Sequence, residues 1–266
     1  MSTTDDDVTR DWLGEPGDAS PPDPVRAARA NTAPPLPKRF YKEAGLAAVE
    51  GGHRLVLDGR GANTPGRRPL AVPSEALGRA LAAEWAAQGE VIDPRTMPLT
   101  RLVNTAIDGV ADRRPEVAAD LGAFAATDLI AYRADSPERL VAEQSAAWDP
   151  LVAWAGDVLG ARLFLAEGVM HVAQPEASVA ALRAAVEAVE DPFRLAALHT
   201  LTTLTGSLVI GLAVLRGRLS PDAAWAAAHV DETYQASVWG PDEEAAARLA
   251  HRKAEFDAAA TVAELR

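Results

Sequence analysis

The hydrophobic pattern of the chain centres on one stretch in its C-terminal third. No charge occurs between Arg194 and Arg216, and the apolar residues there fall on every side of a helical wheel. A helix without a polar stripe must be covered on all sides, so the pattern predicts a core helix. Asp191 can cap it, and Pro192 suits its first position, where an N–H has no helical partner in any case. With Gly217 as the end signal, we expect one continuous helix between these limits.

A stretch of about 20 uncharged residues is also long enough to span a membrane. Against this alternative, its first half is rich in polar side chains, and no belt of aromatic residues flanks it. The polar residues are His199, Thr200, Thr202, Thr203, Thr205 and Ser207. We therefore expect a buried helix without membrane insertion, in which His199 is a hydrogen-bonded core residue.

The N-terminal residues 1–37 lack a periodic apolar pattern. They contain the run Asp5-Asp6-Asp7 and several dispersed prolines. Such a segment cannot bury enough apolar surface to offset the entropy of ordering, so we predict a disordered, acidic and proline-rich tail. An alternative interpretation makes Trp12-Leu13 a docking motif of a structural adaptor.

Short strands follow this tail. Residues 39–44, 46–49, 53–57, 60–64 and 69–72 read as strands and residues 75–87 as a helix, with turns at Gly51-Gly52, Asp58-Gly59 and Pro65-Gly66. Ser74 can cap the helix. Leu77, Leu81 and Trp85 lie four residues apart, so they form the helix face that we expect to pack on the sheet. The pattern predicts a small α+β domain, residues 38–98, in which one helix covers a β-meander.

Helical patterns dominate the rest of the chain. We expect helices at residues 99–110, 115–130, 138–159, 175–189, 192–216 and 221–238, and a last helix opened by Gly240-Pro241-Asp242. A strand-like run at residues 162–165 is the exception. Short loops between helices are typical of a compact bundle, so we assign residues 99–266 to a larger all-α domain. The predicted fold class is therefore α+β.

Charge and composition exclude several functions. The net charge of −12 argues against nucleic acid and anionic membranes as partners, because both are bound by an excess of Lys and Arg. The lack of cysteine excludes disulfides, zinc thiolates and cysteine nucleophiles. No two histidines have metal-ligand spacing, and the sequence has neither a glycine-rich phosphate loop nor a nucleophile elbow. We therefore predict no catalytic residue, no cofactor site and no metal site, and a protein that is not an enzyme.

The candidate binding residues are acidic and lie near the C-terminus. Two groups of carboxylates bracket an aromatic residue: Asp231 and Glu232 before Trp239-Gly240, and Asp242, Glu243 and Glu244 after it. Carboxylates in a first turn complement the helix dipole, and Glu244 precedes Arg248 by four residues. The residues alone thus favour a capped, salt-bridged helix start over the alternative, a negative corner that binds a basic side chain of a partner protein. The spacing does not fit a calcium loop.

A series of short motifs carries a resemblance to a known family. The first half of the chain contains Arg39-Phe40-Tyr41-Lys42, Leu57-Asp58-Gly59-Arg60, Thr64-Pro65, Ala83-Glu84-Trp85, Ile92-Asp93-Pro94, Met97-Pro98-Leu99-Thr100-Arg101 and Asn104-Thr105-Ala106. The second half contains Thr127-Asp128-Leu129, Tyr132-Arg133, Gln144, Trp148-Asp149-Pro150, Leu201-Thr202, Gly206-Ser207-Leu208, Asp231-Glu232, Trp239-Gly240, Asp242 and Glu244. With them, residues 38–255 resemble the assembly chaperones that handle the alpha subunit of the F-type ATP synthase head.

The resemblance implies a fold and a function. The fold would be an N-terminal α+β domain followed by an orthogonal helical bundle, in agreement with the domains predicted above. Members bind the unassembled alpha subunit, cover a surface that would otherwise aggregate, and use neither ATP nor a cofactor. Glu244 with Asp242 becomes the first choice for client binding, together with Asp231, Glu232 and Trp239. We then expect exposed apolar surface near the last two helices.

The main alternative is a small-molecule enzyme built on the same carboxylates. It would need the side chains of Asp231, Glu232, Asp242 and Glu244 to converge in one concave pocket. The N-terminus shows neither the pattern of a secretory signal nor the Arg-rich, acid-poor helix of a mitochondrial transit peptide. We therefore expect a location in a bacterial cytoplasm rather than in the mitochondrial matrix.

Overall fold

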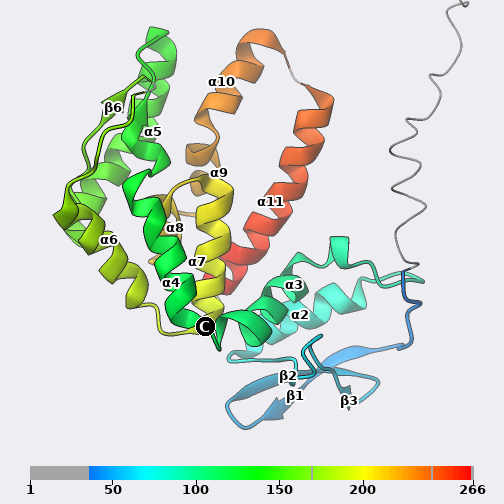
Figure 1. Ribbon diagram of the computed structural model, residues 1–266. Helices are drawn as coiled ribbons and strands as arrows, with labels where there is room; N and C mark the ends of the chain where they lie inside the picture. Colours follow the sequence, from blue (N-terminus) through cyan, green and yellow to red (C-terminus); the bar gives the residue numbers. More distant parts are fainter. Residues whose placement is uncertain (1–35, 169, 241, 265–266) are drawn as a thin grey trace, which may run out of the picture. The chain divides into compact units, whose positions relative to one another are not determined.

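The computed structural model describes residues 36–264, except residues 169 and 241. The predicted tail, apart from Leu36 and Pro37, lies outside the described residues, and so does the candidate docking motif at Trp12. Residues from Lys38 onward form one compact unit, in which a small sheet precedes a set of helices (Figure 1). The predicted α+β fold class, with a small sheet followed by a larger helical part, is confirmed.

The sheet is antiparallel, with the order β1-β2-β3, and β4 also pairs with β2. Its strands are β1 (Ala44–Val49), β2 (Gly52–Leu57), β3 (Arg60–Gly61) and β4 (Ala71–Val72). Asp58 and Gly59 join β2 to β3 and take φ values of 48° and 76°. Two successive positive φ values are what a tight hairpin turn requires, so the predicted Asp-Gly hairpin is confirmed.

The first predicted strand, residues 39–44, is wrong except for its last residue, where β1 begins. Side chains satisfy the backbone here in place of a sheet ladder. The Asp58 carboxylate accepts from the backbone N–H groups of Lys42 and Glu43 at 3.0 and 2.9 Å. The Arg39 guanidinium donates to the carbonyls of Tyr41 and Lys42 at 3.0 and 2.9 Å. A pattern of alternating apolar and polar residues does not reveal such side-chain-to-backbone hydrogen bonds, which compete with strand formation.

Helix α2 (Glu75–Ala86) covers the sheet as predicted. Ser74 Oγ caps it by accepting from the Leu77 backbone N–H at 3.3 Å. Leu77 and Leu81 are buried against the strands, and Trp85 is half-buried with its ring 5.7 Å from that of Tyr41. Residues four apart on one helix face therefore form the contact with the sheet.

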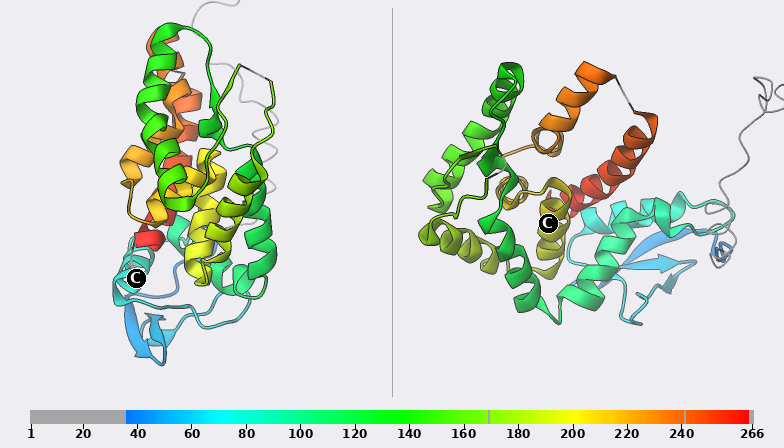
Figure 2. Two further views of the ribbon diagram at one scale, coloured as in Figure 1. Left: turned by 90° about the vertical axis from the view of Figure 1, so that its left-hand side faces the viewer. Right: turned by 45° about the horizontal axis from the view of Figure 1, so that its top comes forward.

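Nine further α-helices follow in the described part of the chain (Figures 1 and 2). They are α3 (Pro98–Thr105), α4 (Arg114–Ala123), α5 (Glu138–Trp154), α6 (Glu176–Glu187), α7 (Pro192–Thr205), α8 (Leu208–Leu215), α9 (Pro221–Ala228), α10 (Val230–Trp239) and α11 (Glu243–Glu264). A π-helical turn extends α3 over Ala106–Val110, and another extends α5 over Ala155–Leu159. Short 3₁₀ helices lie at Pro94–Thr96, Phe124–Ala126 and Leu129–Ala131. The short strands β5 (Tyr132–Arg133) and β6 (Ala166–Glu167) pair in parallel.

The predicted single core helix is two helices, α7 and α8, so the prediction of continuity is wrong. Gly206 ends α7 with φ of 71°, a left-handed conformation that a glycine adopts without strain. Ser207 Oγ then caps α8 by accepting from the Ile210 N–H at 3.0 Å. The burial was predicted correctly, since every residue of α8 is buried. His199 is not a core residue: its side chain is 36% exposed, with Nε2 3.3 Å from Asp120 Oδ2.

Two other predicted helices are interrupted, and the predicted run at residues 162–165 is not a strand. The helix expected at 115–130 ends as α4 at Ala123 and tightens into a 3₁₀ turn up to Ala126. Thr127 then leaves the helical conformation, and Asp128 caps a second 3₁₀ turn, Leu129–Ala131. The helix expected at 221–238 breaks at His229, whose Nδ1 lies 2.8 Å from the Trp225 carbonyl. Within 162–165, the side-chain amide of Gln174 bonds the N–H and C=O of Phe164 in the way a neighbouring strand would.

Within the described residues, no helix combines the length and the apolar character needed to cross a membrane. The longest, α11, carries charged residues along its course, and the most apolar, α8, has eight residues.

Candidate client-binding site

Helices α10 and α11 form a hairpin whose tip holds most of the predicted binding residues (Figure 1). All residues of α10 are half-buried or exposed, and one of its faces holds it to α5. On that face the Asp231 carboxylate accepts from Gln144 Nε2 at 2.7 Å. The Arg139 guanidinium lies 5.4 Å from the centre of the Tyr234 ring. The opposite face of α10 is left free to line the space toward α11.

Helix α11 is divided into a buried half and an exposed half. Its C-terminal half packs Phe256 and the residues after it against α7, α3, α8 and α9. Between the halves, the Arg252 guanidinium donates to the Leu204 carbonyl at 2.7 Å, near the end of α7. From Glu243 to His251 every side chain is half-buried or exposed. The first turns of α11 therefore project from the core beside α10.

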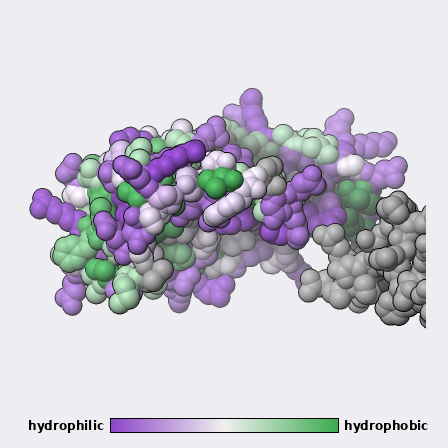
Figure 3. Space-filling view, turned by 90° about the horizontal axis from the view of Figure 1, so that it is seen from above, coloured by the Kyte–Doolittle hydropathy of each residue, from purple (hydrophilic) through white to green (hydrophobic). Residues whose placement is uncertain are grey.

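A cleft of about 520 Å³ lies between the free face of α10 and the exposed half of α11. It is lined by Glu232, Gln235, Ala236, Trp239, Gly240, Asp242, Ala245, Ala246, Arg248, Leu249 and Arg252. At the tip, Trp239 is 76% exposed and Val238 is 50% exposed. Seen from above, apolar side chains interrupt the hydrophilic surface of the molecule (Figure 3). The apolar surface expected near the last two helices is present.

The predicted site residues are only partly brought together. Glu232, Trp239 and Asp242 line the same cleft. Asp242 also caps α11, because its Oδ1 accepts from the backbone N–H groups of Glu244 and Ala245 at 2.9 and 3.2 Å. Glu244 is exposed and pairs with Arg248 at 2.7 Å, while Asp231 faces α5 instead of the cleft. The cap and the ion pair are those of the plain helix start that the residues alone favoured.

The four carboxylates do not form the convergent pocket that an enzyme would need. Asp231, Asp242 and Glu244 have separate partners, on α5, on the backbone of α11 and on Arg248. Among the described residues, no group of three or more His, Asp or Glu side chains is placed to hold a metal ion. This arrangement does not favour the carboxylate-enzyme hypothesis.

A smaller pocket of about 240 Å³ adjoins the cleft and shares Glu232 and Arg252 with it. Its other lining residues include Leu129, Asp231 and Gly206. The break between α7 and α8 thus lies at the base of the hairpin.

Asp128 is the residue that organises this break, and sequence reasoning singled it out only within a motif. Its side chain is fully buried, and Oδ2 accepts from the Val209 N–H at 2.9 Å while Oδ1 accepts from the Ile130 N–H at 3.3 Å. Burial raises the pKa of Asp128 to about 6, and hydrogen bonds from Ser207 and from nearby backbone groups oppose the rise. One carboxylate thereby caps α8 and the turn at Leu129–Ala131 together.

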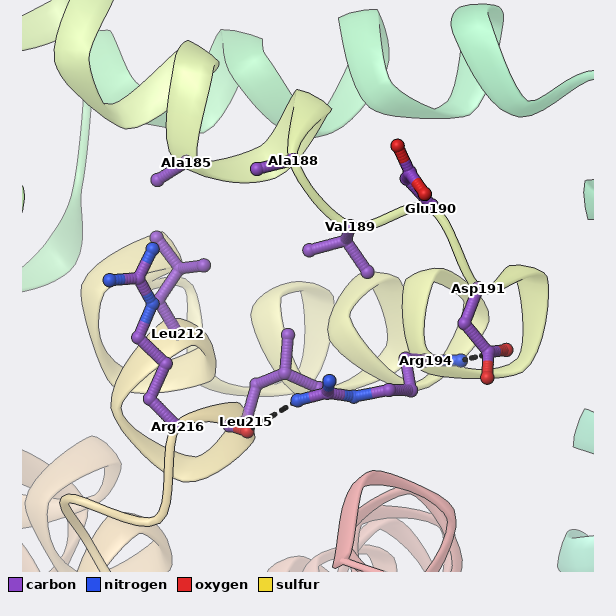
Figure 4. Close-up of a pocket in the computed structure, with 9 residues that line it drawn as sticks. All are labelled: Ala185, Ala188, Val189, Glu190, Asp191, Arg194, Leu212, Leu215 and Arg216. Carbon is purple, nitrogen blue, oxygen red and sulfur yellow. Dashed lines mark hydrogen bonds between the residues drawn. The ribbon is translucent and has the colours of Figure 1, made fainter. Parts of the chain in front are cut away.

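A further pocket of about 340 Å³, which the sequence did not predict, lies where α6 leads into α7, against the end of α8 (Figure 4). Asp191 caps α7 there by accepting from the N–H groups of Phe193 and Arg194 at 2.7 and 3.3 Å. The Arg194 guanidinium donates to the Leu215 carbonyl at 2.8 Å. The Asp191 bonds fix the start of α7, and the Arg194 bond joins it to the end of α8, so these two side chains stabilise the fold.

Comparison with known proteins identifies the family. Residues 38–156 match the family described as ATP12 chaperone protein. Atp12 from Paracoccus denitrificans is 48% identical in sequence to this chain, and its crystal structure matches with a TM-score of 0.78 over 85% of this chain and 97% of that one. The chain belongs to the ATP12 chaperone family. The motif series therefore identified the family correctly, that of the assembly chaperones of the F1-ATPase.

Other similar proteins match over most of their length. The crystal structure of Atu1473 from Agrobacterium tumefaciens, described as a candidate chaperone, has 48% sequence identity and a TM-score of 0.83, covering 92% of each chain. The mitochondrial atp12 protein of Schizosaccharomyces pombe is 26% identical over 233 residues, which are 82% of this chain and 80% of the relative. The family is described as one of chaperones, whereas the alternative from the sequence was a small-molecule enzyme.

Proposed function

We propose that this ATP12 chaperone binds the unassembled alpha subunit of the F-type ATP synthase head and holds it until assembly. The observation that carries the proposal is the hairpin of α10 and α11, where Trp239 and Val238 are exposed beside carboxylates. A chaperone needs surface that complements the interface of its client. An exposed aromatic anchor with a charged rim is typical of residues that dominate protein interfaces.

Each predicted residue has a place in this function. Glu244, exposed at the tip, and Asp242 orient a basic edge of the client. Trp239 and the apolar wall of the cleft cover part of the interface that the alpha subunit later gives to its neighbour. Asp231 holds α10 on α5 and so positions the hairpin, and Glu232 contributes charge inside the cleft. Release follows competition by the beta subunit, without ATP hydrolysis or a cofactor.

The proposal extends to the location of the protein. The similar proteins from Agrobacterium and Paracoccus are bacterial and support a bacterial cytoplasm, where F1 subunits are made. The Schizosaccharomyces relative carries a mitochondrial designation in its name. A cytoplasmic site of action places the chaperone beside newly made alpha subunit.

The test is co-expression with the alpha subunit and, separately, with the beta subunit of the same organism, followed by size-exclusion chromatography of the soluble fraction. We expect co-elution with alpha alone. Glu244→Lys reverses the charge at the tip and should weaken the complex at least tenfold, because a basic edge of the client then meets a like charge. Glu116→Lys is the matched control, since Glu116 is also an exposed carboxylate in the first turn of a helix.

Failure of both subunits to bind would end the client assignment. Binding of alpha that is equally strong in both variants would keep the client but remove Glu244 from the contact. Circular dichroism of each variant checks that the helical content is unchanged. We expect no change in Glu244→Lys, because the ion pair between Glu244 and Arg248 is exposed and contributes little to stability.

A further inference from the structure

Among the described residues, no other helix packs on the two helix faces that form the walls of the cleft. Residues of α10 that line it are spaced by three and four, at Glu232, Gln235, Ala236 and Trp239. Those of α11 follow the same rule, at Ala245, Leu249 and Arg252. Neighbouring antiparallel helices usually pack at 8–10 Å. Here α10 packs on α5 and α11 packs on α7 and α3, and the two helices run apart from each other in Figure 1 and in the right-hand view of Figure 2.

The backbone of the walls restricts what can enter. In the body of a helix, N–H and C=O groups are bonded to each other, so α10 and α11 offer no sheet edge to an incoming chain. An extended segment in the cleft would leave its own backbone groups unpaired and removed from water, which is unfavourable. A helix satisfies its backbone internally and needs only side-chain contacts. Such a cleft therefore favours a helix over an extended segment.

The side chains of the walls fit a third helix. Ala236, Ala245 and Ala246 are small, so an approaching helix can come close to both walls. Trp239 at the tip and Leu249 farther along supply larger apolar surface. A ridge of apolar side chains spaced by three and four on the incoming helix would be covered on two sides.

The charges select the flanks of that helix. Between residues 231 and 252 the chain has five carboxylates and two guanidinium groups. Arg248 is paired with Glu244, and Arg252 with the Leu204 carbonyl. Glu232 and Asp242 line the cleft, and the exposed Glu243 and Glu244 follow Asp242 in the first turn of α11. These four carboxylates outnumber Arg248 and Arg252, which favours Lys and Arg beside the apolar ridge.

We propose that the cleft binds an amphipathic helix of the client, with an apolar ridge between α10 and α11 and basic residues facing the carboxylates of the hairpin. This inference rests on the proposed function, since the client is taken to be the alpha subunit. It adds the form in which the client is recognised: one helical segment, completing a three-helix arrangement with the hairpin.

The experiment uses the full chain and labelled 20-residue peptides that tile the alpha subunit of the same organism. Fluorescence anisotropy gives the affinity of each peptide, and circular dichroism follows its helix content on binding. Ala246→Trp fills the cleft, and Ala247→Trp places the same side chain on the next residue, which is exposed but does not line the cleft. Both changes are on the exposed half of α11, where a larger side chain has room.

We expect one or a few tiles with an apolar ridge and basic flanks to bind and to gain helical signal. Ala246→Trp should raise their dissociation constant at least tenfold, and Ala247→Trp less than twofold. Raising the salt from 50 to 500 mM should weaken binding several-fold, since the charges at the opening are exposed. A tile that binds without gaining helix, or equally well to both variants, would overturn the inference.

The whole alpha subunit separates this inference from the function on which it rests. Binding of the subunit that is insensitive to Ala246→Trp, with no tile bound, would overturn the helix-in-cleft inference and leave the client assignment intact. No binding of the subunit by the unmodified chain would overturn both.

Discussion

At the scale of single residues, Asp128 is the least expected feature of the structure. Buried carboxylates are rare unless they are hydrogen-bonded, and this one joins two helix starts that are about 80 residues apart in sequence. A carboxylate has two oxygens and about four acceptor positions, so each oxygen can accept from the backbone N–H of a different helix start. A side-chain amide has one oxygen, which would have to accept from both. The charge itself is unfavourable there, which is why the pKa is raised.

This residue gives a pH dependence with a definite sign. The pKa of Asp128 is raised on folding from 3.8 to about 6. Its protonation therefore contributes fully to the free energy of unfolding below pH 4, and this contribution is lost as the pH rises through 6. In Asp128→Asn that dependence is absent. The free energy of unfolding of the unmodified chain, relative to the variant, should fall by about 1.4 kcal/mol between pH 5 and pH 8 in urea titrations.

Subtracting the variant cancels the other titrating groups, which both proteins share. The exposed Asp157→Asn is the matched control and should leave the difference near zero at both values of pH. A difference between Asp128→Asn and the unmodified chain that does not change with pH would contradict the burial of a titrating carboxylate.

At the scale of elements, most helices could be read from the sequence and their interruptions could not. Capping residues such as Ser74 and Asp191 act on their own helix, so a local pattern is enough to place them. The break between α7 and α8 depends on Asp128, a residue far away in sequence. An apolar run that contains Thr, Gly and Ser can form a continuous helix. It is interrupted only where another side chain, here that of Asp128, can bond the backbone groups that the interruption leaves without helical partners.

The candidate site shows the same division. The sequence pointed to Trp239 and to the carboxylates around it, because charged and aromatic residues cluster there in order. The cleft was not predictable in this form, since it depends on α10 packing against α5 through Asp231 and Tyr234. Hairpin helices are ordinarily expected to pack on one another.

The break between α7 and α8 can be tested at Gly206. Its φ of 71° is strained for any residue with a side chain, although an added Cβ would find only an ordinary contact at 3.7 Å, with Leu129. Gly206→Ala should therefore cost about 1–2 kcal/mol of backbone strain. That would lower Tm in a thermal melt by about 2–4 °C for each kcal/mol.

The control is Gly89→Ala, at a position where an added Cβ meets nothing within 4 Å and φ lies outside the left-handed region. It should leave Tm unchanged or raise it slightly. Equal effects of the two substitutions would mean that the conformation of Gly206 does not limit the stability of the break.

At the scale of the whole molecule, the sheet and the helices from Lys38 onward are tied by carboxylates. Glu84 of α2 accepts from the backbone N–H groups of Leu99 and Thr100 at 2.8 and 2.7 Å, and so caps α3, whose own cap residue makes no side-chain bond. Asp108 accepts from Thr64 Oγ1 at 2.7 Å and from the Gly66 N–H at 2.8 Å. The proposed division after residue 98 thus runs through a hydrogen-bonded junction.

Glu84→Ala should destabilise both sides of this junction together. Removing a cap costs about 0.5–2 kcal/mol, and two backbone donors lose their partner. In urea, we expect one transition at lower denaturant concentration, seen alike by far-UV circular dichroism and by tryptophan fluorescence. The exposed Glu90→Ala should leave the midpoint in place, and two separated transitions in the unmodified chain would show that the halves unfold independently.

The contrast between α8 and α10 has a consequence for the time scale on which the protein moves. A helix with every residue buried exchanges its amide protons only when much of the molecule opens, whereas one held on a single face opens locally. Deuterium should therefore enter α10 long before α8 in exchange followed by mass spectrometry. A client bound to the hairpin would slow the exchange of α10, and release of the client would restore its fast rate. The exchange rate of α10 thus reports whether the chaperone is occupied.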